Sequence, residues 1–439
     1  MNPDPALAAG PAATVVQVRS PLVTRTVAVD PASAPTDLLD LLPREGGMAW
    51  VRRGDGLVAW GEVARIETSG AERLDAAEEQ WRSMAAHAVV RDEVRVPGTG
   101  PVAFGSFAFA DDSPSGGALV VPRVVVGRRG STVWVTTMDT GAVAAPAPAL
   151  VTQDPPQAPG AVTYRDGGLT REGWQEAVAR AVRRIRAGDL DKVVLARDVL
   201  ATTTEPLDPR WVLHRLAADY GSCWTFAVDG LLGATPELLV RSDKGLVTSR
   251  VLAGTIRRTG DDDADLARAA ILAHSSKDLE EHEYAVASLT EALGPFCSST
   301  NVPETPFVLH LPNVLHLATD VTGVLSTEGG GPTPSSLALA AALHPTAAVA
   351  GTPTLAACEL IGQVEGMDRA RYAGPVGWLG ADGDGEWGIA LRSAELDPQD
   401  PRRLRLFAGC GIVAASVPSA ELGESEAKLE PMRHALHTD

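Results

Sequence analysis

The chain has 439 residues, of which 38 are Lys or Arg and 56 are Asp or Glu, so its net charge is −18. This acidic balance argues against a nucleic-acid-binding protein, which needs a basic face, and against docking on anionic membranes. Hydrophobic residues make up 45% of the chain, as in ordinary globular proteins. The four cysteines form no CxxC pair, and Met1 is not followed by a basic and then an apolar segment. We therefore expect a cytoplasmic protein in a reducing compartment, without disulfides or a membrane span.

Residues 20–140 alternate short strand-like runs with one helical stretch. Apolar and aromatic runs predict strands, and the spacing of apolar residues predicts a helix over 71–90. The predicted strands lie at 47–52, 57–61, 102–109 and 132–137. A Pro/Ala-rich segment follows and reads as an extended crossover. We therefore divide the chain into an N-terminal half (1–160) and a second region (161–439).

The second region begins with a helix and continues largely in hairpins. Trp174, Val178, Val182 and Ile185 repeat at helical spacing. Further strands are predicted at 192–197, 225–228, 231–233, 238–241, 376–379, 387–392 and 404–408, and helices at 265–293 and 419–436. Because hairpins outnumber βαβ units, the pattern favours an α+β fold built on antiparallel sheets.

Gly409-Cys-Gly-Ile-Val-Ala matches the glycine pattern of a dinucleotide site. That fingerprint needs a helix that starts at the glycines, whereas the sequence that follows looks extended. The glycines are better explained by close approach of a ligand to the backbone, since glycine has no Cβ. The chain also lacks a P-loop, a zincin motif and a serine-hydrolase elbow.

Two helical segments carry carboxylates on one face. Asp278 and Glu281 are three residues apart, and Glu421, Glu424 and Lys428 follow one another at spacings of three and four. Such patterns are usually solvated faces with i,i+4 ion pairs. The alternative is that the two acidic faces meet across a cleft and hold Mg²⁺, an ion that prefers a few carboxylates, water and an anionic substrate.

Glu237 and Lys192 each lie at the start of an apolar run. Glu237 follows a proline, and Lys192 precedes Val-Val-Leu-Ala. Both could be ordinary charged residues at strand ends. Alternatively, partial burial could make Glu237 a proton donor with a raised pKa, and Lys192 a base with a lowered one.

Taken together, these segments resemble the chorismate-utilising enzymes, a family that includes isochorismate synthase, salicylate synthase, anthranilate synthase component I and aminodeoxychorismate synthase component I. The resemblance covers about residues 170–432, and the N-terminal part resembles the more variable half of the family. The matching segments, in chain order, are 192–197, 233–239, 252–255, 276–283, 315–319, 343–346, 372–378, 389–392, 407–413 and 421–428. The resemblance implies antiparallel sheets packed as a sandwich and flanked by helices.

The resemblance also implies roles for individual residues. Glu281 and Glu424 are similar to the direct Mg²⁺ ligands, and Asp278 and Glu421 would hold metal-bound water. Arg392 resembles the guanidinium that grips a substrate carboxylate. The rest of the implied substrate-binding surface is Gly254, Thr255, His316, Tyr372, Gly409 and Lys428.

Lysine at position 192 is the residue that separates the members. In the family it activates water for attack at C2 of chorismate, while Glu237 would protonate the departing C4 hydroxyl. This implies an isochorismate synthase that feeds menaquinone or siderophore synthesis, acting as a monomer without a glutamine amidotransferase subunit. Salicylate synthase, which also eliminates pyruvate, and the ammonia-using anthranilate and aminodeoxychorismate synthases remain alternatives. A chorismate-binding protein without activity should lack a catalytic residue, and none is missing.

Overall fold

The computed structural model describes residues 20–141, 145–326 and 333–438, except for the side chains of Lys277 and Glu281. Within these residues the helices are α1 (Arg73–Ala86), α2 (Arg171–Arg186), α3 (Pro209–Asp219), α4 (Asp262–Ala273), α5 (Ser276–Leu293), α6 (Ser336–Leu343), α7 (Thr354–Val364) and α8 (Pro418–Leu436). The strands of the N-terminal half are β1 (Leu22–Val29), β2 (Gly47–Arg52), β3 (Asp55–Thr68), β4 (Val89–Asp92), β5 (Val102–Phe107), β6 (Gly117–Arg129) and β7 (Thr132–Thr140). Those of the second region are β8 (Val162–Asp166), β9 (Lys192–Thr203), β10 (Trp224–Val228), β11 (Leu231–Thr235), β12 (Leu238–Asp243), β13 (Leu246–Arg257), β14 (Cys297–Asn301), β15 (Phe307–His310), β16 (Val314–Leu325), β17 (Gly351–Thr352), β18 (Pro375–Gly380), β19 (Gly385–Ile389), β20 (Ser393–Leu396) and β21 (Arg403–Ile412).

The strands pair almost entirely antiparallel, and strands of the two regions pair with each other. Trp50 of β2 lies opposite Phe226 of β10, and Phe104 of β5 lies opposite Trp378 of β18. Of the described pairs, only β1 with β4 is parallel. The predicted α+β class with antiparallel sheets is therefore confirmed, while the division at residue 160 stays a prediction.

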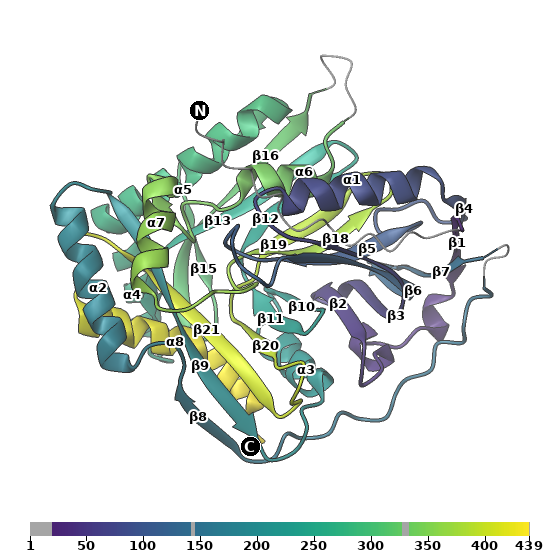
Figure 1. Ribbon diagram of the computed structural model, residues 1–439, viewed down its shortest axis with the longest axis horizontal. Coiled ribbons are helices and arrows are strands. Elements are labelled where there is room, and N and C mark those ends of the chain that lie inside the picture. The colour runs from purple at the N-terminus through teal and green to yellow at the C-terminus, as the bar shows by residue number, and fades with distance from the viewer. Residues whose placement is uncertain (1–19, 142–144, 327–332, 439) are drawn as a thin grey trace, which may run out of the picture.

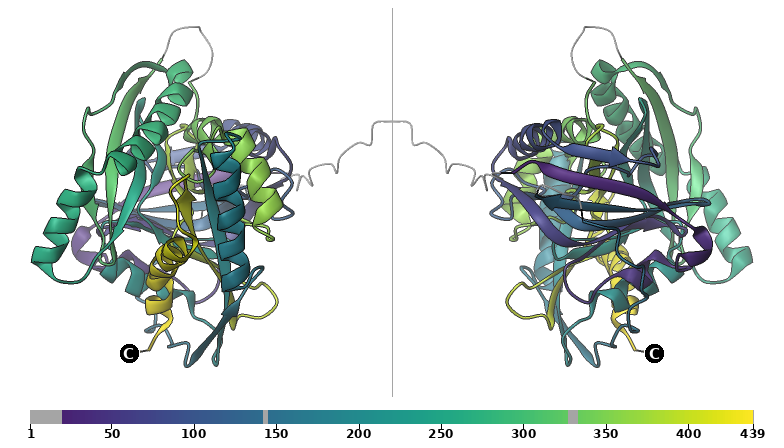
Figure 2. Two further views of the ribbon diagram at one scale, coloured as in Figure 1. Left: turned by 90° about the vertical axis from the view of Figure 1, so that its left-hand side faces the viewer. Right: turned by 90° about the vertical axis from the view of Figure 1, so that its right-hand side faces the viewer.

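Helices cover the sheets from outside (Figure 1). The strands of the N-terminal half lie on the right in this view, and α2, α7 and α8 lie on the left. In the side views, these three helices face the viewer in one panel, and β-strands of the first half face the viewer in the other (Figure 2). The larger apolar cluster includes Trp50, Trp174 and Trp387, and so joins residues of both regions into one core.

Two predicted helices have different bounds in the structure. The prediction of one helix over 265–293 is wrong, because the segment forms α4 and α5 with a break at His274 and Ser275. The Ser275 hydroxyl accepts from the Asp278 N–H at 3.3 Å and caps a new helix. The helix predicted over 71–90 ends earlier, because Val89 and Val90 form β4 beside β1.

Two antiparallel ladders carry most of the candidate residues. β9 pairs with β21 along ten residues of β21, and β13 pairs with β16. The second ladder has an irregularity between Ala253 and Thr255, where Gly254 has a φ of +75°. Helix α5 packs on β13 and α8 packs on β21. No helix in the described part of the chain is both long and apolar enough to cross a membrane.

Candidate active site

One pocket gathers the side chains that the sequence singled out. It lies between the two ladders, α5 and α8. The predicted residues that line it are Lys192, Glu237, Gly254, Thr255, Asp278, His316, Tyr372, Arg392, Gly409, Glu421, Glu424 and Lys428. Glu281 belongs to α5, but its side chain lies outside the described part of the structure. The structure thus places segments that are far apart in sequence around one cavity, and the roles of the residues stay predictions.

Glu237 is buried in the tight connection between β11 and β12. Its N–H donates to the hydroxyl of Thr235 at 3.2 Å, and that hydroxyl donates to the carbonyl of Ile389 at 2.6 Å. Only 4% of Glu237 is exposed. Burial raises the pKa of its carboxyl to about 8, against the opposing charges of Lys192, Arg392 and Lys428. Glu237 is therefore a protonated acid at neutral pH.

Lys192 is the first residue of β9 and is 4% exposed. The strand is held on both sides, since Thr352 of β17 lies opposite Lys192 and Ile412 of β21 lies opposite Val193. The positive charge of Lys192 is the largest of the fields that oppose the rise in the pKa of Glu237. Lys192 and Glu237 therefore affect each other electrostatically across the pocket.

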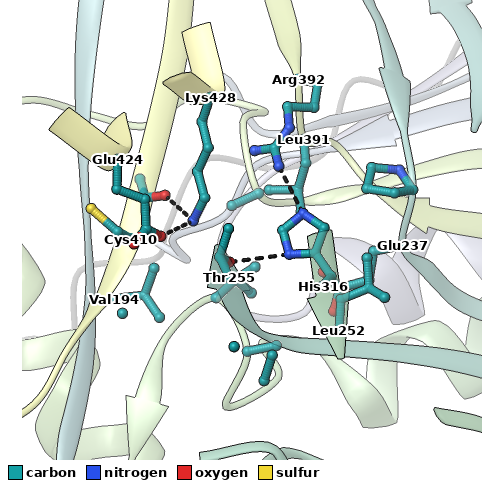
Figure 3. Close-up of a pocket in the computed structure, with 18 of the residues that line it drawn as sticks. Val194, Glu237, Leu252, Thr255, His316, Leu391, Arg392, Cys410, Glu424 and Lys428 are labelled. Carbon is teal, nitrogen blue, oxygen red and sulfur yellow. Dashed lines mark hydrogen bonds and ion pairs between the residues drawn. The ribbon is translucent and has the colours of Figure 1, made fainter. Parts of the chain in front are cut away.

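His316 links two other residues of the pocket (Figure 3). Its Nε2 lies 3.1 Å from Nη2 of Arg392, and its Nδ1 lies 3.1 Å from the hydroxyl of Thr255. Because a guanidinium can only donate, Nε2 accepts and Nδ1 carries the proton. Burial, together with the charges of Arg392 and Lys428, lowers the pKa of His316 well below its ordinary value. His316 is thus a neutral acceptor that orients Arg392.

Arg392 has donors to spare. The residue is 8% exposed, and its Nε has no hydrogen-bond partner among the described residues. Its backbone adopts a φ of 49°, a value that residues other than glycine rarely adopt. A buried guanidinium with an unsatisfied N–H and a strained backbone is suited to bind a carboxylate.

Lys428 of α8 forms the other cationic end of the pocket. Its Nζ lies 2.7 Å from Glu424 (Figure 3) and donates to the carbonyl of Gly409 at 2.9 Å. Burial alone would lower the pKa of Lys428, but the charge of Glu424, its hydrogen bond and the nearby Cys410 together outweigh burial, and the pKa is raised. Lys428 is therefore a permanent cation at this end of the cavity.

Carboxylates from two helices face the same pocket. Asp278 comes from α5, and Glu421 and Glu424 come from α8. Glycine at position 254 allows α5 to approach, because a Cβ there would lie 3.0 Å from the Cβ of Asp278. Oxygen donors of this kind suit Mg²⁺. Among the described side chains, no group of three His, Cys, Asp or Glu lies close enough to hold a metal ion, and the predicted ligand Glu281 was not among them.

Comparison with known proteins agrees with this geometry. The model of the family described as chorismate binding enzyme matches residues 18–437. This chain belongs to that family.

Relatives of this chorismate binding enzyme include named isochorismate synthases. It is 41% identical over 279 residues to isochorismate synthase DhbC of Bacillus subtilis, which covers 61% of this chain and 68% of the relative. It is 35% identical over 416 residues to the salicylate biosynthesis isochorismate synthase of Pseudomonas aeruginosa, which covers 88% and 84%. Among solved structures, MenF, the menaquinone-specific isochorismate synthase from Escherichia coli, matches with a TM-score of 0.79 and 26% identity over 95% of each chain.

One charged residue of the pocket of this chorismate binding enzyme was missed by sequence reasoning. Arg369 lines the cavity, is 3% exposed and pairs with Glu365, which is 2% exposed. The only signal in the sequence is an acid and a base four residues apart. That spacing is far more common on solvated surfaces, so it did not distinguish this pair.

Proposed function

We propose that this enzyme is an isochorismate synthase, which converts chorismate to isochorismate. The observation that carries the proposal is the placement of Lys192 and of the buried, protonated Glu237 in one pocket with Arg392 and Lys428. A base and an acid on a single substrate are what an exchange of one hydroxyl for another requires. The names of the relatives support the same reaction.

The proposed reaction moves two protons and four electron pairs. Lys192, acting as the base, accepts a proton from water as the water oxygen bonds to C2 of the ring. The C1–C2 double bond shifts to C1–C6, and the C5–C6 double bond shifts to C4–C5. The C4–O bond breaks, and Glu237 donates its proton to the departing hydroxide, which leaves as water. One water enters and one leaves, so the product is an isomer, and a proton passing from Lys192 to Glu237 resets the enzyme.

Chorismate carries two carboxylates, and the pocket offers two cationic ends. Arg392, oriented by His316, would bind one carboxylate through its spare donors, and Lys428 would attract the other. Glu281 and Glu424 would hold Mg²⁺, with Asp278 and Glu421 binding its water, and the ion would supply positive charge that neutralises a substrate carboxylate. Binding at both ends would fix the ring relative to Lys192 and Glu237, and this orientation would increase the rate.

A product assay tests the proposal. The purified protein is incubated with chorismate and Mg²⁺, with and without ammonium, and the products are separated by chromatography and identified by mass. Isochorismate without pyruvate is the expected result. Salicylate with pyruvate would instead make the chain a salicylate synthase. Anthranilate or aminodeoxychorismate formed only with ammonium would contradict the assignment of Lys192 as the base for water, and unchanged chorismate would leave a binding protein.

A further inference from the structure

We propose that the buried Glu365–Arg369 ion pair is a positioning device for Lys192, because it fixes the backbone of the strand that carries this residue. The consequence for the rate rests on the proposed function, in which Lys192 is the base. The pair itself is not assigned a contact with the substrate.

Arg369 joins two backbone segments beneath the pocket. Its Nη2 donates to the carbonyl of Val194 at 2.7 Å, two residues from Lys192 on β9. Its Nη1 donates to the carbonyl of Val349 at 2.9 Å, just before β17, whose Thr352 lies opposite Lys192. The guanidinium thus binds both the strand of Lys192 and the segment that leads into its pairing partner.

Glu365 completes the arrangement from the other side. It accepts from Nε of Arg369 at 2.9 Å and from Nη2 at 2.5 Å, and the same oxygen that faces Nη2 accepts from the Ala196 N–H at 2.7 Å. β9 is therefore held at two points, Val194 and Ala196, by one ion pair. The backbone of β9 at these two residues can shift only if these bonds change.

Arg369 and Arg392 line the same pocket but differ in their free donors. Four of the five N–H groups of Arg369 are accounted for by protein oxygens, and its guanidinium lies 4.2 Å from the ring centre of Phe109. In Arg392, Nε has no partner among the described residues. The geometry therefore gives the substrate carboxylate to Arg392 and leaves Arg369 to hold the backbone.

The test compares two conservative variants, Arg369→Lys and Arg210→Lys. Arg210 is a matched control: it is buried, binds Asp208 through two N–H groups at 2.9 and 2.6 Å, and donates to the carbonyls of Leu42 and Asp154. None of these residues lines the pocket. Both substitutions keep the charge and lose the fork that binds two carbonyls, so they should destabilise the fold similarly.

The first readout separates kcat from KM. Arg369→Lys should lower kcat by about 10–100-fold, as expected when a reacting group is displaced, and change KM by less than about threefold, because the carboxylate-binding residues lie elsewhere. Arg210→Lys should leave both within about twofold. Measurements are made at a temperature at which both variants are folded by circular dichroism.

The second readout does not depend on activity. The chain has only four lysines, Lys192, Lys244, Lys277 and Lys428, so NMR spectra of protein labelled with ¹³C-lysine are simple. The Lys192 signal, assigned by its loss in Lys192→Ala, should move in Arg369→Lys, whereas the Lys244 signal should not. Neither should move in Arg210→Lys.

The outcomes are distinct. A shifted Lys192 signal with a selective loss of kcat in Arg369→Lys supports the proposal. An unchanged Lys192 signal, or an equal loss of kcat in both variants, overturns it and leaves the pair a source of stability alone. A shifted signal in an enzyme that makes no isochorismate keeps the positioning role and refutes the proposed function. If Arg369→Lys does not fold, Glu365→Gln is compared with Asp208→Asn by the same criteria.

Discussion

The buried carboxyl of Glu237 should make the stability of the ligand-free protein depend on pH. Its pKa is 4.5 in the unfolded chain and about 8 in the fold. Between these values the folded protein holds a proton that the unfolded chain has released, so the free energy of unfolding falls as pH rises. The free energy of unfolding falls by about 1.4 kcal/mol for each pH unit, and by about 5 kcal/mol over the full range from pH 4.5 to 8. Glu237→Gln keeps the shape and removes this ionisation.

The assay is urea unfolding of wild type and Glu237→Gln at pH 5 and pH 9, with EDTA present. Titration of all other groups is common to both proteins and cancels in their difference. Between pH 5 and pH 9, the free energy of unfolding of wild type should fall by about 3–5 kcal/mol more than that of Glu237→Gln. The variant should also have lost nearly all turnover. Glu283→Gln, at an exposed position of α5, is the control and should show no such gain. A difference between wild type and Glu237→Gln that is the same at both pH values would refute the reasoning.

Three further changes test the other parts of the site. Lys192→Ala should reduce kcat by at least about 1000-fold with an unchanged circular dichroism spectrum, and near-normal turnover would remove it from the acid–base pair. Glu281→Ala should abolish activation by Mg²⁺, which a titration of rate against Mg²⁺ measures, and an unaltered midpoint would exclude it as a ligand. Gly254→Ala should cost about 1–2 kcal/mol in urea unfolding, because of its φ of +75°, and weaken Mg²⁺ activation by pressing on Asp278. If Gly254→Ala has the same stability and the same Mg²⁺ activation as wild type, the result would argue against the close packing of β13 on α5.

Local sequence patterns predict many helices and strands correctly. They fail where a helix cap or a distant strand partner determines the bounds of an element. The run at 47–52 is β2 as predicted, because a short continuous apolar run followed by a turn specifies a strand without help from the rest of the chain. The prediction of one helix over 265–293 is wrong, because apolar periodicity continues across Ser275. Only the cap formed by the Ser275 hydroxyl marks the start of the second helix. Periodicity reports burial of a face, not continuity of the backbone.

The candidate site shows the same limit. The motifs predicted which residues share the pocket, but the protonated state of Glu237 depends on burial by strands far away in sequence. The proton on Nδ1 of His316 likewise follows from Arg392, which the sequence places 76 residues away. The Glu365–Arg369 pair could not be predicted, because its importance comes from the carbonyls and the N–H that it binds and not from its own residue types.

The two groups proposed to exchange protons with the substrate come from separate pieces of backbone. Lys192 opens β9, whose neighbours are β8, β17 and β21, whereas Glu237 lies between β11 and β12, beside β19 and β20. Neither segment pairs with the other in any described ladder. A substitution at Lys192 therefore breaks no strand pairing of the β11–β12 connection, although it removes the charge that most strongly opposes the raised pKa of Glu237. Variants at position 192 screened with ammonia or small amines in place of water would show whether Glu237 still serves the leaving group when the nucleophile changes.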